Sequence, residues 1–221
     1  MVKVLGLDCS GASCSAAVLA AGELRAQRFA AMEHGQAEAL MPMIQAVLAE
    51  AALGAAQLDL IAVTVGPGSF TGVRTGLAAA RGLGLATGRP VMGVTSFAAV
   101  AEAVRVEAGG RPLIIALESK RQELFLQRVG PEGVGEGALV PPEAWRDVVA
   151  ATAFLAGDGA LRLAAALDRP KADILSAAPI DAAHVARLAA LRWRAGLELP
   201  APRPLYLRAP DTTVAQTPPP A

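Results

Sequence analysis

The chain has 221 residues, which is enough for one large domain or two small ones with separate cores. Its 20 lysines and arginines are balanced by 20 aspartates and glutamates, so the net charge gives no general attraction to a polyanion such as RNA. Hydrophobic residues make up 53% of the chain but aromatic residues only 4%, which leaves few side chains on which bases could stack. We therefore expect any link to nucleic acid to run through a partner protein.

Three further features concern where the protein acts. No uncharged apolar run approaches the roughly 18 residues that a membrane-spanning helix needs. Asp8 interrupts the first apolar segment, so we expect no signal peptide. Cys9 and Cys14 form no CxxC pair, and we expect them to be small packing residues in a reducing compartment. Together these features predict a cytoplasmic protein.

The first hundred residues predict alternating strands and helices. Apolar and β-branched runs predict strands at 2–7, 13–19, 23–29, 60–65 and 91–94. Apolar residues at helical spacing predict helices at about 40–51, 71–87 and 97–104. The strand at 60–65 runs directly into a glycine loop, Gly66–Gly72, which opens the second of these helices.

The pattern restarts after residues 107–112, a Gly- and Pro-containing segment that we interpret as a domain boundary. Further strands are predicted at 113–117, 123–129 and 154–156, and a last helix at 181–194. Each half therefore opens with a strand, an acidic turn and a return strand. We predict an α/β protein with an N-terminal lobe at 1–106, a C-terminal lobe at 107–209 and a disordered, Pro- and Thr-rich tail at 210–221.

The hairpin around Asp8 is the first candidate site. A strand that ends in Asp8 and is followed by Ser10, Gly11 and a return strand resembles the first phosphate hairpin of the actin–Hsp70–sugar-kinase superfamily. In active members of that superfamily the acid organises Mg²⁺, and a second hairpin completes the nucleotide site. The matching segment here, Ala116–Gln122, has no glycine and carries two cations, so its backbone cannot approach phosphate oxygens as closely. The sequence therefore predicts a degenerate nucleotide cleft with Asp8, Ser10 and Gly11 on one side.

Two glycine-containing turns are weaker candidates. The loop Gly66–Gly72 precedes a helix, where free N–H groups can hold an anion, but it matches neither the dinucleotide nor the Walker spacing. We expect this loop to be a tight turn that positions the helix, and Gly157–Gly159 to be a turn with a cap. The two histidines, His34 and His184, form no metal-binding helix pair, and no serine lies in a GxSxG motif. We therefore expect no catalytic residue and no metal site.

The helix at 71–87 carries a stripe of small residues on one face. Gly72, Gly76, Ala80 and Gly84 recur every four residues and so stack along the helix. An interior glycine costs about 0.5–1 kcal/mol relative to alanine, so this pattern is typical of a face that another backbone approaches closely. From the pattern alone, that backbone belongs either to a partner or to the protein's own sheet.

Taken together, these motifs resemble the TsaB family, also called YeaZ. The longest match runs from Val65 to Leu77 and reads VGPGSFTGVRTGL. Shorter matches in the first hundred residues, and looser ones in the second half, accompany it: Leu7–Ser10, His34 with Leu40–Pro42, Gly93–Ser96, Gly157–Gly159 and Pro204–Arg208.

The resemblance implies an actin-like (ASKHA superfamily) two-lobed fold with a duplicated mixed-sheet core. It also implies a non-catalytic subunit needed for threonylcarbamoylation of the adenosine next to the anticodon, in tRNAs that read codons beginning with adenine. The implied partners are a catalytic TsaD-type paralogue and a TsaE-type ATPase, with tRNA contacted only indirectly. The chain is expected to have no cofactor of its own, and any nucleotide is expected at the subunit junction.

The resemblance further implies where the partner binds. The family's pairing surface is the helical face of the first lobe, so we expect these residues to face the partner: Gly72, Gly76, Ala80, Gly84, Leu40, Met41 and Ile44. Without its partner, such a face should make the chain a homodimer. Glu118 and Gln122 stand where the family's second hairpin has Asp and Gly, which counts further against nucleotide binding. The alternative functions are a metallopeptidase-like enzyme (glycoprotease) and an independent actin-like ATPase.

Overall fold

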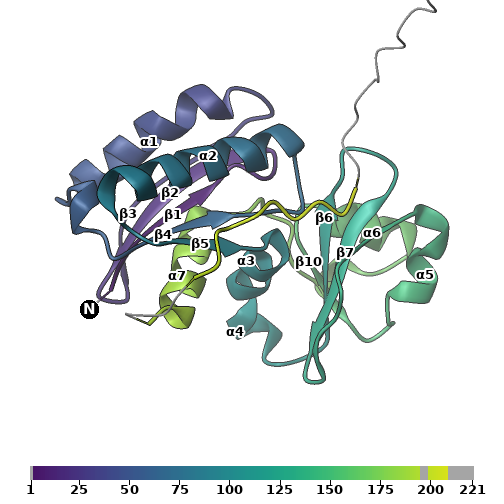
Figure 1. Cartoon of the computed structure of the whole chain (residues 1–221). Coiled ribbons are helices and arrows are strands. Elements are labelled where there is room, and N and C mark those ends of the chain that lie inside the picture. The colour runs from purple at the N-terminus through teal and green to yellow at the C-terminus, as the bar shows by residue number, and fades with distance from the viewer. Residues whose placement is uncertain (1, 195–198, 209–221) are drawn as a thin grey trace, which may run out of the picture.

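The computed structural model describes residues 2–194 and 199–208, and Figure 1 shows two lobes, each built on its own sheet. In the first sheet, β1 pairs antiparallel with β2, which pairs antiparallel with β3, while β4 and β5 extend the sheet from β1 as parallel strands. The spatial order is β3-β2-β1-β4-β5. The strands span β1 (Lys3–Asp8), β2 (Ser13–Ala20), β3 (Glu23–Ala31), β4 (Leu60–Thr64) and β5 (Val91–Val94).

The second sheet repeats this arrangement. Its spatial order is β11-β10-β6-β7-β8, with β9 also paired to β7. The β6–β7 hairpin corresponds to β1–β2, and β10 and β11 extend the sheet in parallel as β4 and β5 do. The strands span β6 (Leu113–Glu118), β7 (Leu124–Gly130), β8 (Gly133–Val134), β9 (Ala138–Val140), β10 (Phe154–Ala156) and β11 (Ile174–Ser176). The duplicated mixed-sheet core of the predicted actin-like fold is therefore confirmed.

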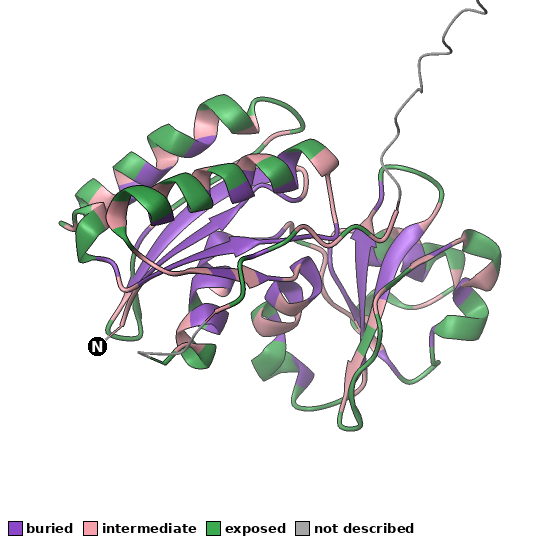
Figure 2. Cartoon of the chain, viewed as in Figure 1, coloured by how far each residue is buried: buried purple, intermediate pink, exposed green. Residues whose placement is uncertain are grey.

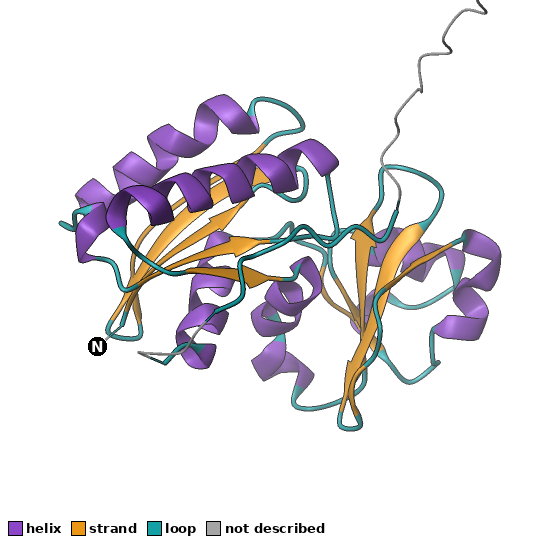
Figure 3. Ribbon diagram, viewed as in Figure 1, coloured by secondary structure: helices purple, strands orange, loops and turns teal. Residues whose placement is uncertain are grey.

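Helices cover both faces of the first sheet (Figure 3). α1 (Gln36–Glu50) and α2 (Phe70–Thr87) lie side by side on one face, and α7 (Ala182–Arg192) packs on the other. α3 (Ser96–Ala103) and α4 (Arg105–Ala108) lie where the lobes meet, while α5 (Trp145–Val148) and α6 (Ala160–Ala166) belong to the second lobe. Short 3-10 turns occur at Ala55–Gln57, Pro142–Ala144 and Lys171–Asp173. No helix in the described ranges is long and apolar enough to cross a membrane.

The position of α7 depends on the small residues of the first hairpin. A Cβ atom at Gly6 of β1 would collide with the Ala182 carbonyl oxygen and lie 2.9 Å from Ala186 Cβ, so only glycine lets the helix approach this strand. The Ala182 N–H donates a hydrogen bond to Ser15 Oγ on β2 at 3.0 Å. The start of α7 is therefore attached directly to the first sheet.

The expected division of the chain into lobes stays a prediction, but α7 packs against the lobe to which its sequence position does not assign it. The boundary at 106/107 falls within α4, before β6. α7 lies inside the expected C-terminal lobe, 107–209, yet it packs against the first sheet because the helix fills the face that α1 and α2 leave uncovered. The expected tail, 210–221, lies outside the described residues.

The last described segment, 199–208, forms no regular secondary structure and runs past both lobes (Figure 1, yellow). We call this segment the strap. Its Leu205 N–H donates to the Val65 carbonyl oxygen, which follows β4, at 2.7 Å. The strap thus places residues from the far end of the chain beside the glycine loop of the first lobe.

Candidate functional site

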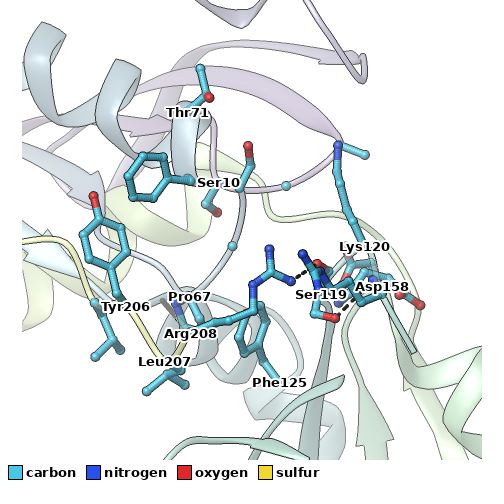
Figure 4. Close-up of a pocket in the computed structure, with 18 of the residues that line it drawn as sticks. Ser10, Pro67, Thr71, Ser119, Lys120, Phe125, Asp158, Tyr206, Leu207 and Arg208 are labelled. Atoms are coloured by element: carbon cyan, nitrogen blue, oxygen red, sulfur yellow. Dashed lines mark hydrogen bonds between the residues drawn. The ribbon is translucent and has the colours of Figure 1, made fainter. Parts of the chain in front are cut away.

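A cleft of about 630 Å³ lies between the two lobes. Most of its lining residues come from four segments, represented in Figure 4 by Ser10, Pro67, Ser119 and Tyr206. These segments are the turn after β1, the glycine loop before α2, the turn after β6 and the strap. The sequence-predicted residues Ser10 and Gly11 line this cleft, and Asp158 of the second lobe lies opposite, with its Oδ2 3.9 Å from the Cβ position of Gly11.

Asp8, the third predicted residue of the cleft, points into the protein. It is fully buried, and its Oδ1 accepts hydrogen bonds from Ser10 N at 3.1 Å, Ser10 Oγ at 2.6 Å and Thr64 Oγ1 at 2.6 Å. Its Oδ2 has no hydrogen-bond partner among the described residues. Burial raises the pKa of this carboxyl from 3.8 to about 6. In this arrangement Asp8 holds the turn after β1 against β4, and it does not line the cleft.

The glycine loop packs directly on that turn. Ser69 N–H donates to the Ser10 carbonyl oxygen at 2.7 Å, and Ser69 Oγ accepts from Gly72 N–H at 3.2 Å as the N-cap of α2. A Cβ atom at Gly68 or Gly72 would collide with the carbonyl oxygens of Ser10 and Cys9, respectively. These glycines therefore allow close contact between two backbone segments, as expected for a tight turn that positions the helix.

The second hairpin binds an arginine side chain from helix α6. Arg162 on α6 makes a bidentate ion pair with Glu118, with Nε–Oε1 and Nη2–Oε2 distances of 3.0 and 2.7 Å. The same guanidinium donates to the carbonyl oxygens of Arg121 at 3.2 Å, Gln122 at 2.8 Å and Glu123 at 3.2 Å. A turn that binds phosphate offers N–H donors, whereas this one offers carbonyl acceptors to an arginine. This turn therefore presents hydrogen-bond acceptors where a phosphate hairpin presents donors.

Asp158 joins this hairpin to α6. Its Oδ1 accepts from Glu118 N–H at 2.9 Å, and burial raises the pKa of the Asp158 carboxyl. Gly157 has a φ of 107°, and a Cβ atom there or at Gly159 would crowd the Ala116 backbone or the Leu124 side chain. The Gly157–Gly159 segment is therefore a turn closely packed on the second hairpin.

The predicted orientation of the glycine stripe is wrong. Gly72, Gly76, Ala80 and Gly84 are buried under α2. A Cβ atom at Gly76 would lie 3.3 Å from Val63 Cγ2 on β4, and one at Gly84 would lie 2.6 Å from Val91 Cγ2 on β5. The stripe therefore packs on the protein's own sheet, because α2 must lie close to the side chains of β4 and β5 to bury them.

The expected contribution of α1 is corrected in the same way. Leu40 and Ile44 are each only 1% exposed and belong to the core beneath α1. Met41, in contrast, is 41% exposed. Of the seven residues expected to face a partner, only Met41 lies on the outside of the protein.

The outer sides of α1 and α2 form a different surface, which is exposed in Figure 2. Leu85 is 90% exposed there, and no other part of the described chain comes within 4 Å of the Cβ position of Gly82. We call this surface the outer helical face. Its exposed uncharged residues include Ala37, Met41, Pro42, Gln45, Thr71, Ala78, Gly82 and Leu85, and the charged residues Glu38, Glu50, Arg74 and Arg81 are exposed on the same helices. The helical period could have indicated this surface, because Met41 and Leu85 do not fall on the face that each helix buries.

Among the described residues, no group of three or more His, Cys, Asp or Glu side chains could hold a metal ion. His184 lies on α7, and its Nδ1 is buried without a hydrogen-bond partner within that part of the chain. Burial lowers the pKa of its imidazole. The lowered pKa favours the neutral form of this histidine.

Comparison with known proteins connects this geometry to a family. The family described as TsaD, tRNA N6-adenosine threonylcarbamoyltransferase, matches residues 28–134. The tRNA threonylcarbamoyladenosine biosynthesis protein TsaB of Haemophilus influenzae is 34% identical over 134 residues, which are 60% of this chain and 56% of that protein. The Escherichia coli TsaB is 29% identical over 125 residues, 56% of this chain and 53% of that protein. The chain thus matches little more than half the length of these two TsaB proteins.

Other relatives match along nearly the whole chain. An uncharacterized protein of Mycobacterium tuberculosis is 33% identical over 94% of this chain and 92% of its own length. The solved structure of YeaZ from Pseudomonas aeruginosa is 28% identical, with a TM-score of 0.76, and the match covers 94% of this chain and all of that one. A second Pseudomonas aeruginosa structure, described as similar to peptidase YeaZ, gives 29% identity and a TM-score of 0.78 over the same shares. With these matches, the duplicated fold and the glycine loop in place, the chain belongs to the TsaB (YeaZ) family.

Proposed function

We propose that the chain is a non-catalytic partner subunit in the threonylcarbamoylation of tRNA, acting by pairing with a catalytic paralogue of the TsaD type. Its TsaB relatives are named for threonylcarbamoyladenosine biosynthesis in tRNA. The adenosine concerned lies next to the anticodon in tRNAs that read codons beginning with adenine. A TsaE-type ATPase completes the proposed assembly, and tRNA is contacted through the partners.

The observation that carries this proposal is the outer helical face. Leu85 and Met41 are large apolar side chains that are 90% and 41% exposed on neighbouring helices, and we take them as apolar contacts of a partner surface. The small residues Ala78 and Gly82 are also exposed on α2, so a partner helix can approach that backbone closely. The same face gives a symmetric homodimer when the partner is absent.

The cleft supports a non-catalytic role. Asp8 is buried away from the cleft, and the second hairpin binds Arg162 through its carbonyl oxygens. An independent ATPase would need N–H donors at that hairpin and a carboxylate that reaches the cleft. We place any nucleotide of the assembly at the junction with the partner.

The test is a substitution on the outer helical face. Leu85→Asp puts a charge where we propose an apolar contact, so affinity for the TsaD paralogue of the same cell should fall about tenfold or more. Leu161→Asp is the matched control, because Leu161 is 53% exposed on α6 of the second lobe. Calorimetric titration with TsaD and sedimentation of the isolated chain are the measurements. Unchanged affinity of Leu85→Asp, or equal losses in both variants, would contradict the proposed pairing surface.

A further inference from the structure

The strap holds the first lobe through several contacts besides the hydrogen bond from Leu205. Arg81 on α2 donates to the Pro202 carbonyl oxygen. Pro202 itself is buried against β5, where its Cβ would lie 3.2 Å from a Cβ atom at Gly93. A Cβ atom at Gly66 would lie 2.8 Å from the Leu205 carbonyl oxygen. The two glycines therefore provide the space in which the strap lies.

A second group of contacts joins the strap to the outer side of α2. Arg74 Nε donates to the Tyr206 hydroxyl at 2.9 Å, and the Arg74 guanidinium carbon lies 3.6 Å from the centroid of the Phe70 ring. The Phe70 and Tyr206 rings are 5.1 Å apart between centroids. Arg74 is exposed and lies one helical turn from Ala78 of the outer helical face. A partner on that face would therefore lie beside the Arg74–Tyr206 contact.

The far end of the strap reaches the second lobe. Arg208 Nη1 donates to the Ser119 carbonyl oxygen, in the turn after β6, at 3.2 Å. Ser119 Oγ in turn donates to the Glu123 carbonyl oxygen at 2.6 Å, so this turn is internally braced. Leu205 to Arg208 also line the cleft, as Figure 4 shows for Tyr206, Leu207 and Arg208. The strap thus connects α2 to the second hairpin along the side of the cleft.

We propose that the strap couples the outer helical face to the second lobe, with Arg74 as the positioning residue that joins them. This inference rests on the proposed function, because it describes how partner binding at that face is regulated. A partner beside Arg74 excludes water from the guanidinium and so strengthens its contacts with Phe70 and Tyr206. The strap is then held more firmly, and through Arg208 it fixes the turn after β6.

The coupling works in both directions. If partner binding stabilises the strap, releasing the strap must weaken partner binding by the same factor. The strap is suited to this role because its Tyr206–Arg208 end pairs with no described strand. Side-chain contacts hold this end, including the hydrogen bonds of Tyr206 and Arg208, the Phe70–Tyr206 ring contact and the packing of Leu207 against the core. Such a segment opens at a lower free energy than the core strands that it touches.

Hydrogen exchange of the isolated full-length chain tests the link without any partner. Tyr206→Ala removes both the ring and the hydroxyl, and exchange of the backbone amides at 118–123 should become about tenfold faster or more. Tyr206→Phe keeps the ring, so its effect should be smaller. Arg128→Ala, a change at an exposed site on β7, is the control and should leave this turn unchanged. Unchanged exchange at 118–123 in Tyr206→Ala overturns the proposal.

Affinity for the TsaD paralogue tests the coupling. Tyr206→Ala and Arg74→Ala should each weaken binding about fivefold, and the double variant should lose little more than either one, because both changes break the same link. Additive losses, or wild-type affinity in Tyr206→Ala, overturn the coupling. If the wild-type chain does not bind TsaD at all, the proposed function fails, and the coupling to a partner fails with it even where the exchange result stands.

Discussion

Two residues of the hairpins beside the cleft, Asp8 and Arg162, show how this protein differs from the pattern of an active nucleotide site. Asp8 stands at the end of β1, as the acid of an active superfamily member would, but its three hydrogen bonds all come from Ser10 and Thr64. Arg162, which binds the second hairpin, lies about 40 residues further along the chain. No local pattern around Ala116–Gln122 could therefore reveal this contact. The sequence therefore indicates which hairpins lie beside the cleft, whereas it does not reveal the arginine that binds the second one.

The first prediction at this scale concerns Asp8 and pH. Because the pKa of Asp8 is raised to about 6 in the folded chain, the folded state binds more protons than the unfolded state between pH 3.8 and 6. The contribution of this carboxyl to stability therefore falls as pH rises through that window. Asn cannot ionise, so from pH 3.5 to 7.5 the free energy of unfolding of Asp8→Asn should rise by about 3 kcal/mol relative to wild type.

Chemical denaturation at several pH values measures this difference. The side-chain oxygen of Asn can still accept the hydrogen bonds from Ser10 and Thr64, so the turn after β1 should remain in place. Reconstituted tRNA modification should also persist in Asp8→Asn, since Asp8 does not line the cleft. Parallel stability profiles for the two proteins would show that the carboxyl is not the titrating group.

At the scale of elements, α2 has two sides with different tasks. Its small-residue side lies on β4 and β5, and its outer side carries Leu85 and Gly82 to the solvent. Sequence analysis located the helix and the stripe correctly, because periodicity depends only on local spacing. It could not show that the stripe packs on the sheet. A row of glycines indicates close packing, but it does not identify the neighbouring element.

Two glycines on this helix provide a matched pair for the second prediction. Gly84→Ala places a methyl group 2.6 Å from Val91 Cγ2 and 3.0 Å from the Arg89 carbonyl oxygen, so it should destabilise the fold by about 1–3 kcal/mol. Gly82→Ala meets no atom within 4 Å and should stabilise the helix by about 0.5–1 kcal/mol. Thermal unfolding of both variants measures the difference. Equal effects at the two positions would mean that α2 does not lie on the sheet as described.

At the scale of the whole molecule, the two lobes share a core. Val4 and Leu60 of the first sheet, Phe97 of α3, and Leu113 and Ile115 of the second sheet belong to one buried apolar cluster. The strands of each lobe could be predicted from their apolar runs, and the repeated strand–turn–strand pattern indicated the duplication. The strands β8, β9 and β11 were not predicted, because their two or three residues carry no usable period. The equally short β10 was predicted because it leads into the Gly157–Gly159 turn.

The return of α7 to the first lobe was also beyond local sequence patterns. Its apolar residues predict a helix, but they do not state which sheet the helix covers. The choice depends on long-range packing, including the Gly6 contact with Ala182 and Ala186. The lobe that the sequence assigns to 1–106 therefore has one face covered by residues from 182–192.

The last prediction concerns the dependence of the first lobe on α7. A fragment of residues 1–106 keeps α1 and α2 on one face of its sheet but leaves Val4, Leu60 and Ala62 uncovered on the other. The fragment also loses the burial of Val185 and Leu188, each contributing about 1.5–3 kcal/mol, which is a large part of a typical folding free energy. We expect it to bind a hydrophobic dye and to unfold without a cooperative transition, measured by circular dichroism. Joining residues 178–194 to its end through a flexible linker should restore cooperative unfolding, whereas a Gly6→Leu version of that fusion should not, because leucine blocks the approach of α7 to β1. Cooperative unfolding of the unmodified fragment near the melting temperature of the full chain would show instead that residues 1–106 form an autonomous domain.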